Sequence, residues 1–188
     1  MIEITIVAGI IGVVGAIALP FFEKTVESFR IVGTARSVTN ALSVSKIRAA
    51  STFTRVRLYV DLSTNRHRLE RLDKSVTPAH WTADGSWTAL PSGVTFGFGS
   101  ITTPPAETQP TLGQAPACTD DADTDIGNTA CVTFNSRGVP VKLDGTPENR
   151  DALYVTDGTA IYGVTVAPTG MIRLWRTYPR ETAEWVLQ

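Results

Sequence analysis

The stretch that decides the fold is residues 2–20, IEITIVAGIIGVVGAIALP, at the start of a chain of 188 residues. No charged residue occurs between residues 4 and 22. A helix of that length, rising about 1.5 Å per residue, spans roughly 28 Å, close to the hydrocarbon thickness of a bilayer. The stretch therefore predicts a membrane-spanning helix with one carboxylate, Glu3, near its N-terminal end.

A cleaved secretory signal is the alternative interpretation of this apolar segment. Such signals have a basic front, a shorter apolar region and a small-residue cleavage site. No Lys or Arg precedes Ile4, and the residues after Pro20 continue a helical pattern. We therefore favour a helix that the protein retains.

The residues after Pro20 show a second helical pattern, in which apolar residues recur mostly at steps of three or four. These residues are Phe22, Val26, Phe29, Val32, Ala35, Val38, Leu42 and Ile47. Proline between two helical patterns kinks the helix rather than ending it. The prediction is one long, bent helix from about Ile2 to about Ser51, hydrophobic in its first half and amphipathic in its second.

From Thr54 the period changes to two, and TRVRLYVDL places its apolar residues on one face of a strand. Further strand candidates follow, separated by Gly- and Pro-containing turns. They are HRLERL, residues 94–101, CVTFN, ALYVT, IYGVTVA and MIRLWRTY. The fold class is therefore α+β, with the long N-terminal helix packed on an antiparallel β-sheet head.

Two parts of the chain are expected. Residues 1–22 form a hydrophobic transmembrane or filament-core helix, and residues 23–188 form a globular head. The head combines the amphipathic helix half 23–51 with a β-rich part, 54–188. Its residues 100–130 are rich in Pro, Thr, Gly and Asp and predict a long surface loop.

Cys118 and Cys131 are the two cysteines of the chain and flank part of this loop. In an oxidising compartment we expect them to form a disulfide, which stabilises a loop near this length by roughly 3 kcal/mol. A metal pair is the alternative, but no second Cys or His pair lies nearby at the spacing typical of zinc sites.

The formal net charge of the chain is −1, but its charged residues are distributed unevenly along the sequence. Residues 23–74 hold eleven Lys and Arg against five Asp and Glu, residues 75–135 hold six acids and no Lys or Arg, and residues 136–188 hold six of each. Separate basic and acidic segments indicate self-association or an anionic partner.

The N-terminal stretch resembles that of the type IV pilin-like proteins, which include pilus subunits and the pseudopilins of type II secretion. The match consists of a glutamate, an uninterrupted run of Ile, Val, Ala and Gly, and a proline seventeen positions after the glutamate. The rest resembles the H-type (GspH) minor pseudopilins and FimT-like pilins, through SVSKIRAASTFTRVRLYVD, TFNSRGVP and YGVTVAPTGMIRLW.

This resemblance implies the pilin fold and a subunit that polymerises into a helical filament, with Glu3 and Pro20 as the registry and assembly residues. Glu3 would pair with the N-terminal amine of a neighbouring subunit, because a carboxylate among apolar helices needs a cationic partner. A Glu3 that stays among lipid headgroups is the alternative. The implied partners are other pilins or pseudopilins, an inner-membrane assembly platform and a prepilin peptidase.

Small residues recur in the apolar helix at steps of four, namely Ala8, Gly12 and Ala16. Such residues let neighbouring helix backbones approach closely, which fits packing against copies of the same helix. Glycine is also common in ordinary membrane anchors, so this pattern agrees with a non-polymerising anchored periplasmic domain as well.

The sequence departs from the family pattern at its first residue. Met1 stands where the third residue of a mature family member is expected, and no basic leader, glycine or N-terminal Phe precedes it. The processing and methylation that the family implies are therefore not visible in these residues.

DNA is the main alternative partner, because some FimT-like pilins bind DNA through arginines near the C-terminus. The candidate contacts here are Arg173, Arg176 and Arg180 within GMIRLWRTYPR. Arginines contact phosphates and aromatic rings stack on bases. The family's Gly-Arg-x-Arg reads GMIR in this chain, so its first arginine is missing. A second basic ridge is predicted on one sheet face, formed by Arg55, Arg57, Arg66 and Arg68.

The acidic run DDADTD places Asp121, Asp123 and Asp125 at alternate positions, like half of a calcium loop. The glycine at the sixth loop position and the glutamate at the twelfth are missing, so a solvated acidic loop is the favoured interpretation. No motif for a nucleophile, catalytic metal or nucleotide accompanies His67 or His80. We therefore predict no enzymatic activity and no cofactor.

The combined prediction is a structural subunit of a type IV pilus or type II secretion pseudopilus. Its helix would lie in the inner membrane before assembly and in the filament core afterwards. Its head would face the periplasm or the cell exterior.

Overall fold

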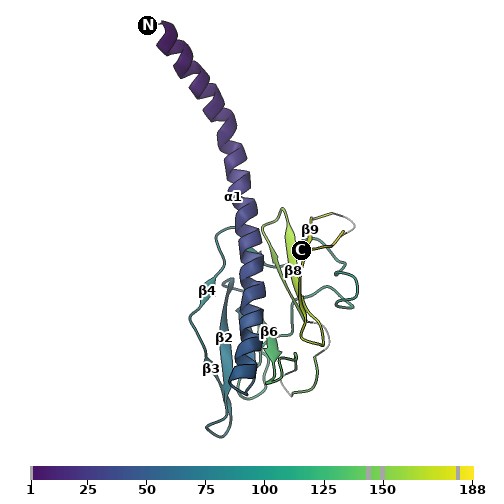
Figure 1. Ribbon diagram of the computed structural model, residues 1–188. Helices are drawn as coiled ribbons and strands as arrows, with labels where there is room; N and C mark the ends of the chain where they lie inside the picture. Colours follow the sequence, from purple (N-terminus) through teal and green to yellow (C-terminus); the bar gives the residue numbers. More distant parts are fainter. Residues whose placement is uncertain (1, 143–144, 149–150, 181–182) are drawn as a thin grey trace.

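The computed structural model describes the backbone of residues 2–142, 145–148, 151–180 and 183–188. Within these ranges, the side chains of residues 2–6 and 8–24 are not part of the description. The chain begins with one helix, α1 (Ile2–Ser51), and the C-terminal half of this helix packs on a β-rich head, while its N-terminal half projects beyond the head (Figure 1). The expected α+β class, with a long N-terminal helix on antiparallel sheet, is confirmed.

Helix α1 continues through Pro20 without interruption, and Figure 1 shows that it curves gently where it leaves the head. Its buried face begins at Ile31 and continues through Ala35, Val38 and Leu42. Two polar residues also lie on that face, but the hydroxyl of each donates a hydrogen bond to a backbone carbonyl one turn earlier. These residues are Thr34, bonded to Arg30, and Ser45, bonded to Ala41. Such bonds satisfy a hydroxyl inside an apolar interface.

The strands form two antiparallel sheets where the sequence analysis expected one. The first sheet has the order β3-β2-β1-β6, with β4 paired to β2. Its strands are β1 (Val56–Asp61), β2 (Arg66–Asp73), β3 (His80–Ala83), β4 (Thr88–Ala89) and β6 (Thr129–Phe134). The second sheet has the order β10-β9-β8-β7-β5. Its strands are β5 (Thr95–Phe96), β7 (Asp151–Thr156), β8 (Ile161–Val166), β9 (Ile172–Thr177) and β10 (Val186–Leu187).

The alternation in TRVRLYVDL is confirmed, because Val56, Leu58 and Val60 are fully buried against the helix side of the first sheet. The strand expected over residues 94–101 is shorter than predicted and consists of β5 alone. Phe96 N–H donates to the side chain of Asn65, and Gly97 N–H donates to the backbone carbonyl of Tyr154 in β7.

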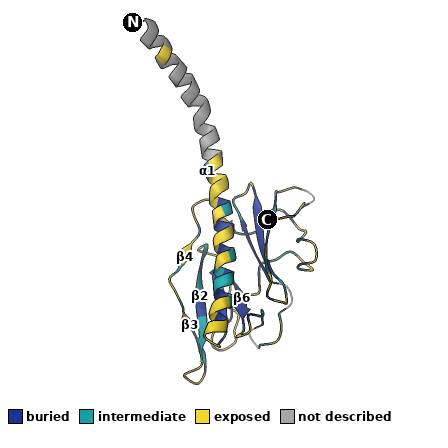
Figure 2. Ribbon diagram, in the orientation of Figure 1, coloured by how far each residue is buried: buried dark blue, intermediate teal, exposed yellow. Residues whose placement is uncertain are grey.

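The main core lies between α1 and the inner faces of both sheets, and Figure 2 shows the buried side of the helix facing them. A second apolar cluster lies on the opposite face of the second sheet. Tyr154 and Ile161 form its centre, and the loop residues Phe98 and Leu112 pack over them. The long loop thus covers a sheet face, which explains why a segment without regular structure contains buried residues.

None of the helical segments with described side chains is both long and apolar enough to cross a membrane. The expected membrane segment, residues 1–22, lies outside this part of the chain apart from Val7.

Candidate functional site

The first candidate site is the projecting half of α1. Its predicted assembly residues Glu3 and Pro20 and its predicted packing residues Ala8, Gly12 and Ala16 all lie in this helix. Their side chains lie outside the described residues, so their roles stay predictions.

Three exposed apolar side chains lie on α1 among the residues whose side chains are described, at Val7, Phe29 and Ile47. Phe29 is 72% exposed and Ile47 is 67% exposed. Their separation of eighteen positions corresponds to about five full turns, so the two side chains share one face. Val7, 55% exposed, lies close to the same line. This face points away from the head because the buried residues Ile31 and Leu42 occupy the opposite side. The outer face of the helix thus has exposed apolar side chains at separate positions, with Gly33, Arg36 and Asn40 between Phe29 and Ile47.

The second candidate site is the outer face of the first sheet, where the loop after residue 115 is fastened to β6. The predicted disulfide between Cys118 and Cys131 is present. The bond is reinforced by hydrogen bonds from Cys131 N–H to the Pro116 carbonyl and from Cys118 N–H to the Thr129 hydroxyl. The loop is therefore held against the sheet at several points.

Arg57 and Glu70 form a buried ion pair beneath this loop, with side-chain exposures of 3% and 4%. Arg57 donates to one Glu70 oxygen from Nε at 2.7 Å and to the Thr119 carbonyl from Nη1 at 2.8 Å. Its guanidinium also lies 4.0 Å from the centroid of the Trp81 ring. Burial lowers the pKa of Arg57, while the carboxylate of Glu70 acts in the opposite direction.

Three of the four arginines of the predicted basic ridge, Arg57, Arg66 and Arg68, share this outer face, and all three are paired with acids. Arg68 donates to the second oxygen of Glu70, and Arg66 contacts Asp61 at 3.3 Å. Both guanidinium groups also lie within 4.4 Å of the centroid of the Trp87 ring. The contacts of these arginines with Trp81 in β3 and with Trp87 just before β4 hold both segments against the outer face of the sheet.

Of the three C-terminal arginines predicted as DNA contacts, Arg176 and Arg180 line one pocket, and Arg173 is not among its lining residues. On β9, Arg173 lies opposite Thr165 and Arg176 lies opposite Tyr162, so the two side chains leave opposite faces of the sheet. Arg180 contacts Glu184 at 3.8 Å. The sequence already predicted this separation of Arg173 and Arg176, because one stands at an odd and the other at an even position, and alternate residues of a strand point to opposite faces.

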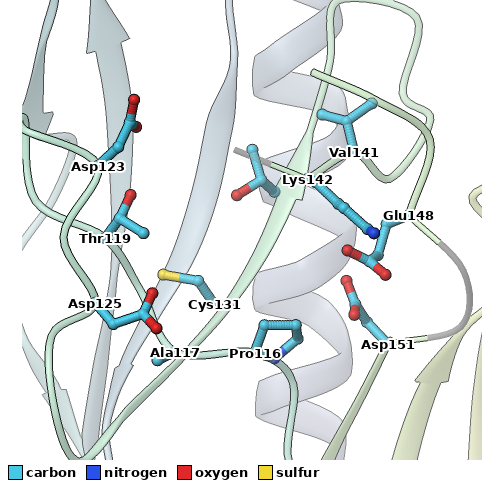
Figure 3. A pocket seen from close by; sticks show the side chains of 11 residues that line it. Pro116, Ala117, Thr119, Asp123, Asp125, Cys131, Val141, Lys142, Glu148 and Asp151 are labelled. Atoms are coloured by element: carbon cyan, nitrogen blue, oxygen red, sulfur yellow. The ribbon is translucent and has the colours of Figure 1, made fainter. Parts of the chain in front are cut away.

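A cavity of about 610 Å³ lies between the disulfide-linked loop, β6 and the segment that leads into β7. Figure 3 shows Thr119, Asp123 and Asp125 on one side of it and Lys142, Glu148 and Asp151 on the other. Asp151 is only 4% exposed. Burial, helped by the charge of Glu148, raises its pKa to about 8, against a smaller opposite effect of Lys142.

The predicted calcium residues are divided between two environments. Asp123 and Asp125 line the cavity, whereas Asp121 accepts a hydrogen bond from Trp81 N–H. In the described part of the chain, no group of three or more Asp, Glu, His or Cys side chains is arranged to hold a metal ion.

Sequence reasoning missed the Arg57–Glu70 pair and the buried Asp151. The strand pattern placed Arg57 on the outer face, and an alternating strand predicts solvent there, not a covering loop. Asp151 begins a strand after a turn-rich segment, a place where aspartate is usually solvated. The sequence pattern around Arg57 and around Asp151 therefore did not predict that either side chain is buried.

No family model and no curated protein matches this chain. The chain is similar to a minor pseudopilin. Two solved structures of EpsH, from the Type 2 Secretion System of Vibrio cholerae, match it with 16% identity and a TM-score of 0.43 each. The matches cover 75% and 79% of this chain and 92% and 94% of the solved chains.

Proposed function

We propose that this protein is a structural subunit of a type IV pilin-like filament, a type IV pilus or a type II secretion pseudopilus, and that it polymerises through α1. The observation that carries the proposal is the division of this 50-residue helix. Among the residues 25–51, whose side chains are described, the buried face against the head begins at Ile31, whereas the helix backbone with Glu3 and Pro20 projects beyond the head (Figure 1).

A projecting apolar helix needs an apolar environment of its own. Most helix stability in proteins comes from packing, and exposed apolar area costs about 25 cal/mol per Å². Lipid supplies this environment before assembly, and copies of the same helix supply it in a filament. The exposed apolar side chains of Phe29 and Ile47 on the outer face of the helix support the second case, because copies of the same helix could cover them.

Glu3 gives the filament its register in this proposal. A carboxylate inside a bundle of apolar helices is costly without a cation, and breaking a buried pair costs about 3–5 kcal/mol. The N-terminal amine of a neighbouring subunit is the proposed partner. The helix would be inserted in the inner membrane, processed by a prepilin peptidase and extracted by an assembly platform, leaving the head in the periplasm or outside the cell.

The test is incorporation of the full-length chain into filaments in cells that hold the complete assembly machinery. Glu3→Ala is expected to lower the filament fraction at least tenfold while the membrane-bound amount stays the same. Glu27→Ala is the matched control, because Glu27 is an exposed glutamate of the same helix beyond the apolar stretch. Unchanged incorporation of Glu3→Ala would show that Glu3 has no registry role.

A second measurement separates a filament subunit from a solitary anchored domain. Cysteines introduced at Phe29 and Ile47 are expected to form crosslinked multimers in the filament fraction. A chain that stays monomeric in the membrane with all assembly components present would refute polymerisation. DNA binding stays a prediction, and no contact described above favours it.

A further inference from the structure

A groove lies beside α1 at the end of the head from which this helix projects (Figure 1). One wall is the part of the helix that first contacts the head, and the other is the segment 88–91, which includes β4. The groove has a volume of about 300 Å³, at the lower end of the range of ligand sites. Its lining residues, all of them described, are Phe29, Arg30, Gly33, Thr34, Ser37, His67, Thr88, Ala89, Leu90 and Pro91.

Backbone pairing fixes the walls of this groove. Strand β4 pairs with β2, with Thr88 opposite His67, and Leu90 N–H donates to the Asn65 carbonyl at 2.8 Å. On the helix wall, a Cβ added at Gly33 would meet no atom within 4 Å. The groove is therefore part of the fold, and the space beside Gly33 is open.

His67 brings an unsatisfied polar atom to this groove. The residue is only 4% exposed, and its Nδ1 is buried with no hydrogen-bond partner among the described residues. Burial lowers the pKa of His67, which favours the neutral imidazole with one donor and one acceptor nitrogen. Buried polar atoms in proteins nearly always have a hydrogen-bond partner. The groove therefore suits a ligand that can form a hydrogen bond with this nitrogen.

Arg30 lies between this groove and a second small pocket. It lines both spaces, and the second, of about 250 Å³, is also lined by Glu27 and Asp157. Glu27 precedes Arg30 by about one turn on the same helix face, and Asp157 lies in the turn between β7 and β8. The two spaces thus place an acidic pocket, a cation and a groove with apolar walls such as Phe29 and Leu90 next to one another.

The place of this site on α1 indicates which ligand has the matching chemistry. Phe22, the last residue of the uncharged stretch, precedes Arg30 by eight positions, or about 12 Å along a helix. The headgroup layer on each side of a bilayer is roughly 5–8 Å deep. A long arginine side chain that slants toward the helix N-terminus can reach this layer. With the apolar stretch in the membrane, the site would therefore face lipid headgroups.

We propose that these adjoining spaces bind one phosphatidylethanolamine molecule before filament assembly. Its phosphate contacts the Arg30 guanidinium and its ammonium group contacts the Asp157 carboxylate. Its glycerol ester part occupies the groove, where His67 Nδ1–H donates to an ester carbonyl. A zwitterionic headgroup fits because it matches both the arginine and the acidic pocket, whereas an anionic headgroup would leave the acids without a cation. The inference rests on the membrane-inserted state of the proposed function.

The experiment is native mass spectrometry of the full-length chain, released from detergent after incubation with one dioleoyl lipid at a time. The lipids are phosphatidylethanolamine, phosphatidylglycerol, and diacylglycerol, which lacks the phosphate. We expect one phosphatidylethanolamine molecule to be retained per chain, at least fivefold more often than phosphatidylglycerol. Diacylglycerol should not be retained.

Three variants locate the site. Arg30→Gln and Asp157→Asn are each expected to lower the retention of phosphatidylethanolamine at least fivefold. Asparagine keeps the side-chain oxygen that accepts from Ala160 N–H, so the turn is preserved. Gly33→Leu should have the same effect by filling the groove. Arg36→Gln is the matched control, because Arg36 is an exposed arginine of the same helix that lines neither space. Circular dichroism confirms that each variant is folded.

A cysteine introduced by Gly33→Cys separates a lipid from a second copy of the chain as the occupant. Both native cysteines are joined in a disulfide, so the new thiol would be the only free one. In membranes of cells that lack the assembly platform, oxidation should leave this variant monomeric. A disulfide-linked dimer would assign the groove to a second copy and overturn the proposal.

The lipid measurements have two further outcomes against the proposal. Equal or greater retention of phosphatidylglycerol, or unchanged retention of phosphatidylethanolamine in Arg30→Gln, would each overturn it. None of these measurements needs a filament, so their failure is distinct from failure of the filament proposal. Lipid retention in a chain that never polymerises would refute the filament alone.

Discussion

Replacing Glu70 by glutamine tests how the outer face of the first sheet is held together. The substitution keeps the shape of the side chain and removes its charge. Arg57 would then stay buried at 3% side-chain exposure with the Thr119 carbonyl and the Trp81 ring as its remaining partners. A buried cation that has lost its counter-ion is the source of the expected damage.

The magnitude follows from the burial of both members of the pair. Removing one partner of a buried ion pair costs about 3–5 kcal/mol. For a chain of this size each kcal/mol lowers the melting temperature by about 2–4 °C, so a decrease of roughly 6–20 °C is expected. The exposed pair of Arg48 and Asp84, with side-chain exposures of 49% and 22%, should contribute less than about 1 kcal/mol.

Urea denaturation of the full-length chain in detergent, followed by circular dichroism, measures these free energies of unfolding. Asp84→Asn is the matched control, since it neutralises an acid paired with arginine at the surface. The double variant Arg57→Met with Glu70→Leu should recover most of the loss, because an apolar pair removes the buried charge altogether. A cost below 1 kcal/mol for Glu70→Gln, or one equal to that of Asp84→Asn, would refute this reasoning.

The remaining predictions concern pH, packing and the loop. The folded-state pKa of Asp151, about 8, lies above its unfolded value near 4, so the free energy of unfolding should fall as pH rises from 4 to 8. Asp151→Asn should flatten that slope and be more stable by a few kcal/mol at pH 8, as urea midpoints at several pH values will show. Gly163→Ala should cost about 1–3 kcal/mol in thermal unfolding, because its Cβ would lie 2.6 Å from the buried Tyr154 ring. Gly33→Ala on the exposed helix face, with no atom within 4 Å, should instead stabilise by up to about 1 kcal/mol. Cys118→Ser should lower the free energy of unfolding by about 3 kcal/mol and increase proteolysis of the loop.

Much of the architecture could be predicted from local sequence periods. A period near 3.6 up to Ser51 and a period of two from Thr54 describe α1 and β1 closely, because both patterns reflect which side of an element faces an apolar interior. The disulfide was predictable because the chain has only two cysteines and they flank a loop. The division of the head into two sheets was not predictable, since strand pairing depends on contacts between distant segments.

The sequence by itself determined the long helix, its apolar first half with a single acid, the alternating strands and the disulfide. These features depend on neighbours in the chain or on a unique pair of residues. Only the tertiary structure decided that Arg57 and Glu70 are buried together and that Asp151 faces Thr119 across a cavity. Burial of a charged group is set by what covers it, and here the cover is a loop brought from 60 or so residues away in the sequence, as the bond from Arg57 to Thr119 shows at a separation of 62.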